Sequence, residues 1–140
     1  MKSGLLSVHG SRGFVGSLVV CGLFILMSGC GQKEIKLQGT PEEGGKLLTQ
    51  MLEAWKDGKS LADYAKSSEP PIVVADEDWA AGATLKSFQM GTPMQYGGLW
   101  RIPVKVVVAH PDRGERERDF AYGVTLQPKT SIIRADDSEF

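Results

Sequence analysis

The stretch that decides the fold reads LWRIPVKVVVAHPDRGERERDFAYGVTL and runs from Leu99 to Leu126. Apolar and polar residues alternate from Leu99 to Ala109, and large apolar residues again occupy every second position near the end of the stretch. A period of two is typical of a strand with one buried face. Between these arms, Pro111-Asp112-Arg113-Gly114 is typical of a type I turn followed by a left-handed glycine. The stretch is therefore predicted to be a β-hairpin.

The turn and the apolar pattern together predict a register for this hairpin. Pairing Pro111 with Glu115 sets Val106 opposite Phe120. The same register sets Val104 opposite Tyr122, Ile102 opposite Val124 and Trp100 opposite Leu126. All the large apolar side chains then share one face, whereas a slip of one residue would set Asp119 against Val106 and destroy that face.

Before the hairpin, the apolar spacing is that of a helix. Thr40 suits the N-cap, Pro41 the first helical position and Glu43 the capping box. The apolar residues that follow are spaced to form one stripe: Leu47, Leu48, Met51, Leu52 and Trp55. Gly58 is a natural end, so the pattern predicts a helix over about 41–57. Ser60 can cap a shorter helix over 61–66.

Short β runs over 72–74, 83–90 and 131–134 complete the pattern. Residues 40–135 are predicted to form a single α+β domain, with one long helix (about 41–57) packed on an antiparallel sheet of four to five strands. This order of elements resembles cystatin-like and small NTF2-like folds, in which a helix packs against a curved antiparallel sheet. Residues 136–140 are expected to be a flexible tail.

Residues 1–29 have the three-part organisation of a secretory signal peptide. Lys2 and Arg12 give a basic start, and an apolar stretch of 14 residues ends at Met27. That stretch is too short to span a bilayer, which takes about 20 residues. The segment Met27-Ser28-Gly29-Cys30 resembles the lipobox of bacterial lipoproteins. The resemblance implies cleavage between Gly29 and Cys30 and attachment of lipid to Cys30, which makes the membrane a partner.

The lipoprotein resemblance also implies a location. In that family an aspartate after the cysteine favours retention in the inner membrane, but Gly31 stands here. An exported protein on the periplasmic face of the outer membrane is therefore expected, if the host has one. Residues 30–39 would form the lipidated cysteine and a tether. The nine residues after Cys30 span about 30 Å when fully extended.

Charge and cysteine content argue against several classes of function. Lys2 and Arg12 are the only charged residues before Cys30, so 14 basic side chains remain against 17 acidic ones. A nucleic-acid partner normally needs a basic face. Cys21 leaves with the signal peptide and Cys30 carries lipid, so the domain has no disulfide, thiol nucleophile or cysteine metal site. Phosphate loops and dinucleotide motifs are absent, and no cofactor is expected.

No residue of the domain is predicted to be catalytic or to bind a metal. His110, the only histidine after Cys30, is expected to be exposed beside the turn, without a nucleophile near it in sequence. Asp76-Glu77-Asp78 is expected to be a charged turn between strands that could cap a helical turn at 79–82. Consecutive carboxylates do not wrap a calcium ion.

Two groups of side chains could bind a ligand or partner. Trp55, Trp100 and Tyr122 could line a pocket between helix and sheet, with Trp79 and Tyr64 as further candidates. Aromatic residues at such positions more often fill a core. Arg116 and Arg118 could form a docking patch beyond the apolar face of the hairpin, and the alternative is a solvated loop.

The leading hypothesis is a lipid-anchored envelope protein that acts as a non-enzymatic binding module for an unknown envelope protein or small ligand. The alternative is a structural or interaction accessory of an envelope assembly, and a small enzyme comes third. A pocket wide enough for a ligand favours the first, and a filled core with an exposed apolar edge favours the second. A buried carboxylate beside His110 favours the third.

Overall fold

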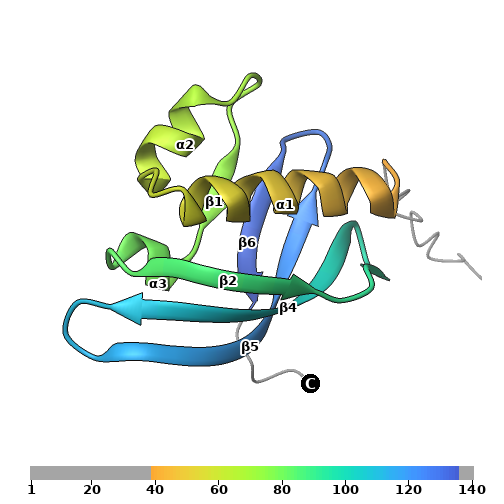
Figure 1. Ribbon diagram of the computed structural model, residues 1–140. Coiled ribbons are helices and arrows are strands. Elements are labelled where there is room, and N and C mark those ends of the chain that lie inside the picture. Colours follow the sequence, from red (N-terminus) through yellow and green to blue (C-terminus); the bar gives the residue numbers. More distant parts are fainter. Residues whose placement is uncertain (1–38, 136–140) are drawn as a thin grey trace, which may run out of the picture. The chain divides into compact units, whose positions relative to one another are not determined.

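The computed structural model describes residues 39–135 (Figure 1). The helices are α1 (Pro41–Lys56), α2 (Leu61–Ser67) and α3 (Glu77–Ala80); the strands are β1 (Val73–Ala75), β2 (Thr84–Met90), β3 (Met94–Tyr96), β4 (Leu99–His110), β5 (Gly114–Thr125) and β6 (Ser131–Ala135). The predicted α+β class is confirmed. The predicted cleavage and lipidation at Gly29 and Cys30, the tether before Gly39 and the tail over 136–140 lie outside the described residues. Among the described helices, none is long and apolar enough to cross a membrane.

The sheet has six strands and is mixed. Its order is β1-β6-β5-β4-β2, and β3 also pairs with β4. The prediction of a wholly antiparallel sheet of four to five strands is therefore wrong in two respects. Strand β3 was not predicted, and β1 pairs with β6 in parallel, with Val73 opposite Ser131. Local sequence around β1 does not specify this partner, because β6 comes last in the chain and inserts between β1 and β5.

The β4–β5 hairpin forms, but its register differs from the predicted one by two residues. His110 pairs with Gly114, Val104 with Phe120 and Ile102 with Tyr122. The cause lies in the turn: Pro111, whose ring fixes φ, is the first residue inside the turn, so the pairing begins at His110. A shift of two keeps every side chain on its predicted face. The large apolar residues therefore still share one buried face.

Helix α1 begins with the predicted capping box. The Thr40 hydroxyl accepts a hydrogen bond from the Glu43 amide at 3.2 Å, and the Glu43 carboxylate accepts one from the Thr40 amide at 2.8 Å. The helix ends at Lys56 with Asp57 as C-cap, one residue earlier than predicted. Helix α2 reaches Ser67, one residue beyond its predicted end.

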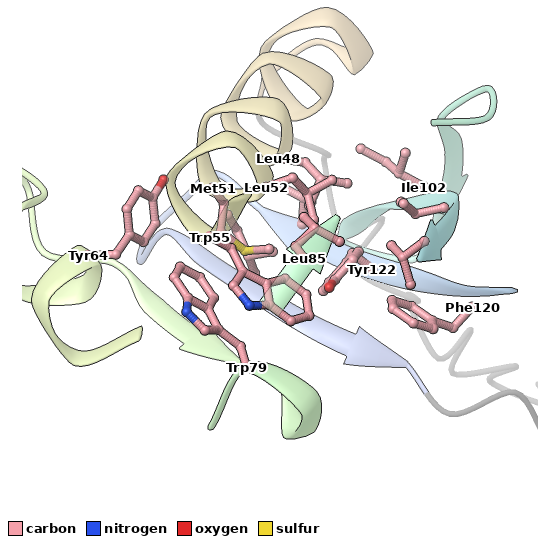
Figure 2. Packing of buried hydrophobic residues seen from close by; sticks show 14 of the residues in the cluster. Leu48, Met51, Leu52, Trp55, Tyr64, Trp79, Leu85, Ile102, Phe120 and Tyr122 are labelled. Atoms are coloured by element: carbon pink, nitrogen blue, oxygen red, sulfur yellow. The ribbon is translucent and has the colours of Figure 1, made fainter. Parts of the chain in front are cut away.

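The apolar stripe of α1 lies on the inner face of the sheet (Figure 2). Leu48, Met51, Leu52 and Trp55 are buried there, against Leu85, Ile102, Phe120, Tyr122 and Val124 of the sheet. At the start of α1, a Cβ atom placed on Gly44 would lie only 3.2 Å from Cδ1 of Trp100, so the glycine lets the helix approach this ring. Side chains thus fill the layer between helix and sheet.

Candidate functional site

The acidic run before Trp79 is buried. Asp76 caps α3, and its Oδ1 atom accepts a hydrogen bond from the Trp79 amide at 2.8 Å. Asp76 is 3% exposed and Asp78 is 5% exposed. The run does cap a helical turn, two residues earlier than predicted, but both aspartates are buried rather than part of a simple charged turn. Burial of Ile72 before the run and Trp79 after it brings the short helix α3 against the body of the domain.

Asp78 pairs with His110. The Nε2 atom of His110 lies 2.8 Å from Oδ1 of Asp78, and both side chains are 7% exposed. The expectation that His110 is exposed is therefore wrong. Strand β4 continues to position 110, and the period of two places this side chain on the inner face with Val106 and Val108. Since an ionised carboxylate only accepts hydrogen bonds, Nε2 carries the proton that it donates to Asp78.

Two arginines complete the surroundings of Asp78. Its Oδ2 atom accepts a hydrogen bond from Nη1 of Arg134 at 2.6 Å and lies 3.5 Å from Nη1 of Arg118. Burial raises the pKa of Asp78, but the hydrogen bond and charge of Arg134, the charge of Arg118 and the His110 hydrogen bond together lower it below its ordinary value. Burial lowers the pKa of Arg134, but its hydrogen bond to Asp78 and the charges of both aspartates raise it overall. Asp78 and Arg134 therefore form a buried ion pair.

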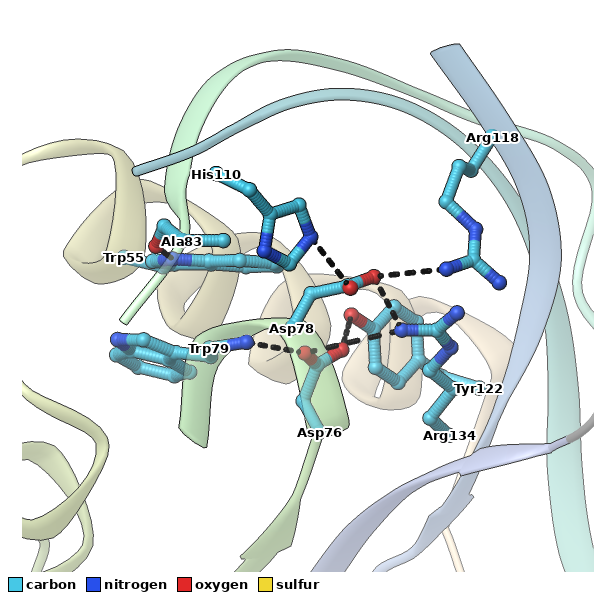
Figure 3. A network of polar contacts seen from close by, with 9 residues as sticks. All are labelled: Trp55, Asp76, Asp78, Trp79, Ala83, His110, Arg118, Tyr122 and Arg134. Carbon is cyan, nitrogen blue, oxygen red and sulfur yellow. Dashed lines mark hydrogen bonds and ion pairs between the residues drawn. The ribbon is translucent and has the colours of Figure 1, made fainter. Parts of the chain in front are cut away.

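Asp76 holds Tyr122 from the other side. The Tyr122 hydroxyl donates a hydrogen bond of 2.5 Å to Oδ2 of Asp76. Burial first, and then the negative charge of Asp76, raise the pKa of Tyr122. The Arg134 guanidinium also lies over the Phe120 ring, 3.9 Å from its centroid. We call Asp76, Asp78, His110, Arg118, Tyr122 and Arg134 the Asp78 network (Figure 3).

The Asp78 network contains the elements of an acid–base pair, which local sequence did not predict. Asp78 is a buried carboxylate beside His110, which is the feature that favours the enzyme hypothesis. However, both oxygens of the Asp78 carboxylate are bound within the network, and neither Asp78 nor His110 lines any of four surface grooves in the described part of the chain. Residues 39–135 contain no cluster of three or more histidine, cysteine or carboxylate side chains able to hold a metal ion.

The three aromatic residues proposed to line a pocket lie in different places. Trp55 is buried in the last turn of α1, whereas Trp100 packs against Gly44 in the first turn. Tyr122 is buried, and its hydroxyl is bound to Asp76. Of the three, Trp55 alone lines one of the four grooves, and its indole N–H donates to the Ala83 carbonyl at 2.7 Å.

The groove beside Trp55 is also lined by Trp79, one of the further candidates from the sequence. The Trp55 and Trp79 rings are stacked, with centroids 5.5 Å apart and planes inclined by 15°. Together with residues 58–62, 80 and 82–84, they line a groove of about 550 Å³. We call this the tryptophan groove. The local sequence feature that indicates the short helix around Trp79 is the N-cap residue Asp76, three residues before Trp79.

The two arginines proposed as a docking patch lie on the inner face of β5. Arg118 is opposite Val106 and Arg116 is opposite Val108. Arg116 is exposed, whereas Arg118 turns toward Asp78 with a side chain that is 39% exposed. Arg118 is thus also a member of the Asp78 network.

Comparison with models of protein families, with curated proteins and with solved structures finds no match for this chain. What the Asp78 network and the tryptophan groove do is therefore inferred from their own geometry and chemistry.

Proposed function

We propose that this protein is a lipid-anchored, non-enzymatic binding protein of the cell envelope, held by Cys30 and binding its ligand in the tryptophan groove. The lipobox-like segment Met27–Cys30 supports the anchor and export. The observation that supports the binding role is the groove lined by the stacked Trp55 and Trp79. The proposed fold type is cystatin-like or NTF2-like, in keeping with a helix laid across one face of a sheet.

The position of the groove suits a membrane-anchored binder. The tether joins the domain at Gly39, just before α1, whereas Trp55 and Gly58 lie at the other end of that helix. A helix of 16 residues is about 24 Å long. In the proposed arrangement the groove therefore lies about one helix length from the tether, where it can receive molecules from the periplasm.

The lining of the groove indicates the chemistry of its ligand. Both indole N–H groups are already used, since Trp55 donates to the Ala83 carbonyl and Trp79 to the Lys59 carbonyl at 2.9 Å. Because Trp55 is 1% exposed and Trp79 is 5% exposed, the two rings form the closed floor of the groove. Recognition would therefore depend on the exposed lining residues, among them Lys59, Ser60 and Thr84. A volume of about 550 Å³ falls within the range of roughly 300–1,000 Å³ for small-molecule sites. A small molecule with an acidic group and hydrogen-bonding atoms fits these features.

Native mass spectrometry of the mature lipidated protein, extracted gently from its own envelope, tests this function. We expect an added small-molecule mass on the wild type and on Ala81→Trp, a matched control at an exposed alanine outside the groove lining. Ala62→Trp fills the groove and should abolish the added mass. A bare wild-type protein, or an adduct that survives Ala62→Trp, would contradict binding in the tryptophan groove.

The second candidate is an interaction accessory of an envelope assembly. The helix–sheet layer is filled, and Val73 of β1 and Ile133 of β6 are 55% and 46% exposed. They lie on the same outer face of neighbouring strands at one edge of the sheet. Cross-linking in intact cells distinguishes this candidate. A partner that is cross-linked to the wild-type protein but not to Val73→Lys would favour the accessory role over ligand binding.

The Asp78 network is assigned a structural role in this proposal. Catalysis would need a substrate within hydrogen-bond reach of His110 or Asp78. Both side chains are 7% exposed, and their facing atoms are bound to each other. An enzyme therefore remains the third hypothesis, and activity lost in His110→Gln without loss of folding would revive it.

A further inference from the structure

The hairpin formed by β3 and β4, over residues 94–101, lies at the end of the domain where the tether enters. Trp100, in this hairpin, packs against Gly44 in the first turn of α1, and Gly39 immediately precedes the Thr40 cap of that helix. Figure 1 shows the same arrangement, with the chain between β2 and β4 near the start of α1 and the β4–β5 turn at the opposite end.

The exposed face of this hairpin is mainly apolar, and its one charged residue, Arg101, lies opposite Met94 and is 9% exposed. Met94 is 51% exposed and Tyr96 is 58% exposed, and the period of two places both on one face of β3. No charged residue occurs from Ser87 to Trp100, the longest uncharged run after Cys30. The tip is Gly97-Gly98, with Gly97 in the left-handed conformation that suits a tight turn.

The length of the tether limits how far this surface can lie from the lipid. Nine residues from Gly31 to Gly39 connect the lipidated Cys30 to the domain. Fully extended, they reach about 30 Å, and any bending shortens the distance. A tether of this length keeps the end of the domain that carries Gly39, and with it the β3–β4 hairpin, within reach of the bilayer.

We propose that the β3–β4 hairpin is a second membrane contact, with Met94 and Tyr96 seated in the headgroup region of the bilayer. This inference rests on the proposed lipid anchor at Cys30. The contact would orient the domain so that the tryptophan groove faces away from the membrane.

The chemistry of the hairpin matches a lipid interface. A tyrosine has an apolar ring and a polar hydroxyl, and such residues are enriched where bilayer and water meet. Methionine is flexible and adapts to an irregular apolar surface. The Arg101 guanidinium lies 5.6 Å from the centre of the Tyr96 ring, a contact that helps to orient the ring. The uncharged tip avoids the cost of moving charge toward hydrocarbon.

A single-cysteine probe tests this contact. Cys21 is removed with the signal peptide and Cys30 is blocked by lipid, so Met94→Cys in the mature lipidated protein offers one thiol for an environment-sensitive fluorophore. Val73→Cys is the matched control, because Val73 is equally exposed but lies on the far edge of the sheet. Both proteins are reconstituted into vesicles of phosphatidylethanolamine and phosphatidylglycerol that contain spin-labelled lipid.

We expect the probe at position 94 to shift its emission to the blue and to be quenched by the spin-labelled lipid. The probe at position 73 should show neither change. Equal behaviour at the two positions, in protein that floats with the vesicles, would overturn the hairpin contact while leaving the Cys30 anchor intact.

Two further outcomes are distinguishable. Failure of the protein to float with the vesicles would contradict the proposed anchor itself, and the hairpin contact with it. A position-94 probe that is shielded from aqueous iodide but not quenched by spin-labelled lipid would show that a second copy of this chain covers the hairpin, which overturns the membrane contact.

Discussion

Asp78 and His110 are 32 positions apart in the sequence, yet their side chains lie 2.8 Å from each other in a site almost closed to water. The same carboxylate binds Arg134, which is 56 positions from Asp78. One side chain of α3 thus ties the segment after β1 to strands β4 and β6. The Asp78 network therefore fixes the position of α3, and with it Trp79 in the tryptophan groove.

Replacing Asp78 with alanine should destabilise the domain by about 3 kcal/mol, because the buried Arg134 loses its closest counter-charge. Urea unfolding of the purified protein measures the change. Glu77→Ala is the control, since Glu77 is the exposed neighbour in the same helix and its loss should cost no more than about 0.5 kcal/mol. Similar urea concentrations at the unfolding midpoints of Asp78→Ala and Glu77→Ala would show that the Asp78 network contributes little to stability.

Stability should also depend on pH through Asp78. The pKa of Asp78 in the folded protein lies below its ordinary value of about 3.9. Its contribution is therefore fully present above about pH 4 and is lost as the pH falls through the folded-state pKa. The difference in unfolding free energy between the wild type and Asp78→Asn should shrink over that range. A difference that stays constant down to pH 2 would contradict this assignment.

Removing the Tyr122 hydroxyl should cost about 2 kcal/mol, because it donates to the buried carboxylate of Asp76 and a hydrogen bond to a charged group is among the stronger ones. Tyr122→Phe keeps the ring and its edge-on contact with Phe120, 5.3 Å between centroids, so the loss is confined to the hydroxyl. Tyr96→Phe removes an exposed hydroxyl and should be nearly neutral. Thermal unfolding of both proteins gives the comparison.

Sequence patterns predicted the local elements well. Thr40 and Glu43 form the expected capping box, and the apolar stripe from Leu48 to Trp55 is buried as expected. The apolar face of the β4–β5 hairpin was also predicted, although its register was displaced by two residues at Pro111. These features depend on residues close together in the chain, where spacing alone carries the information.

The Asp78 network could not be predicted in this way. Three consecutive acidic residues normally indicate a solvated turn, since burying an unpaired carboxylate is costly. Here the cost is offset by Arg134 and His110, which come from β6 and β4 and approach Asp78 through tertiary packing alone. The parallel pairing of β1 with β6 is a further long-range feature, and it brings Arg134 to the same end of the sheet.

The two adjacent glycines at the start of α1 should respond differently to alanine. In a helix interior, alanine is favoured over glycine by up to about 1 kcal/mol. A Cβ on Gly45 would meet only the Met90 Cε atom at 3.8 Å, an ordinary contact, so Gly45→Ala should be stabilising by about 0.5–1 kcal/mol. A Cβ on Gly44 would lie 3.2 Å from the Trp100 ring, so Gly44→Ala must displace that ring and should gain less or lose stability. Urea unfolding of both variants decides the point. Equal gains at the two positions would show that Trp100 moves freely and that Gly44 is not needed for the close approach of α1 to the sheet.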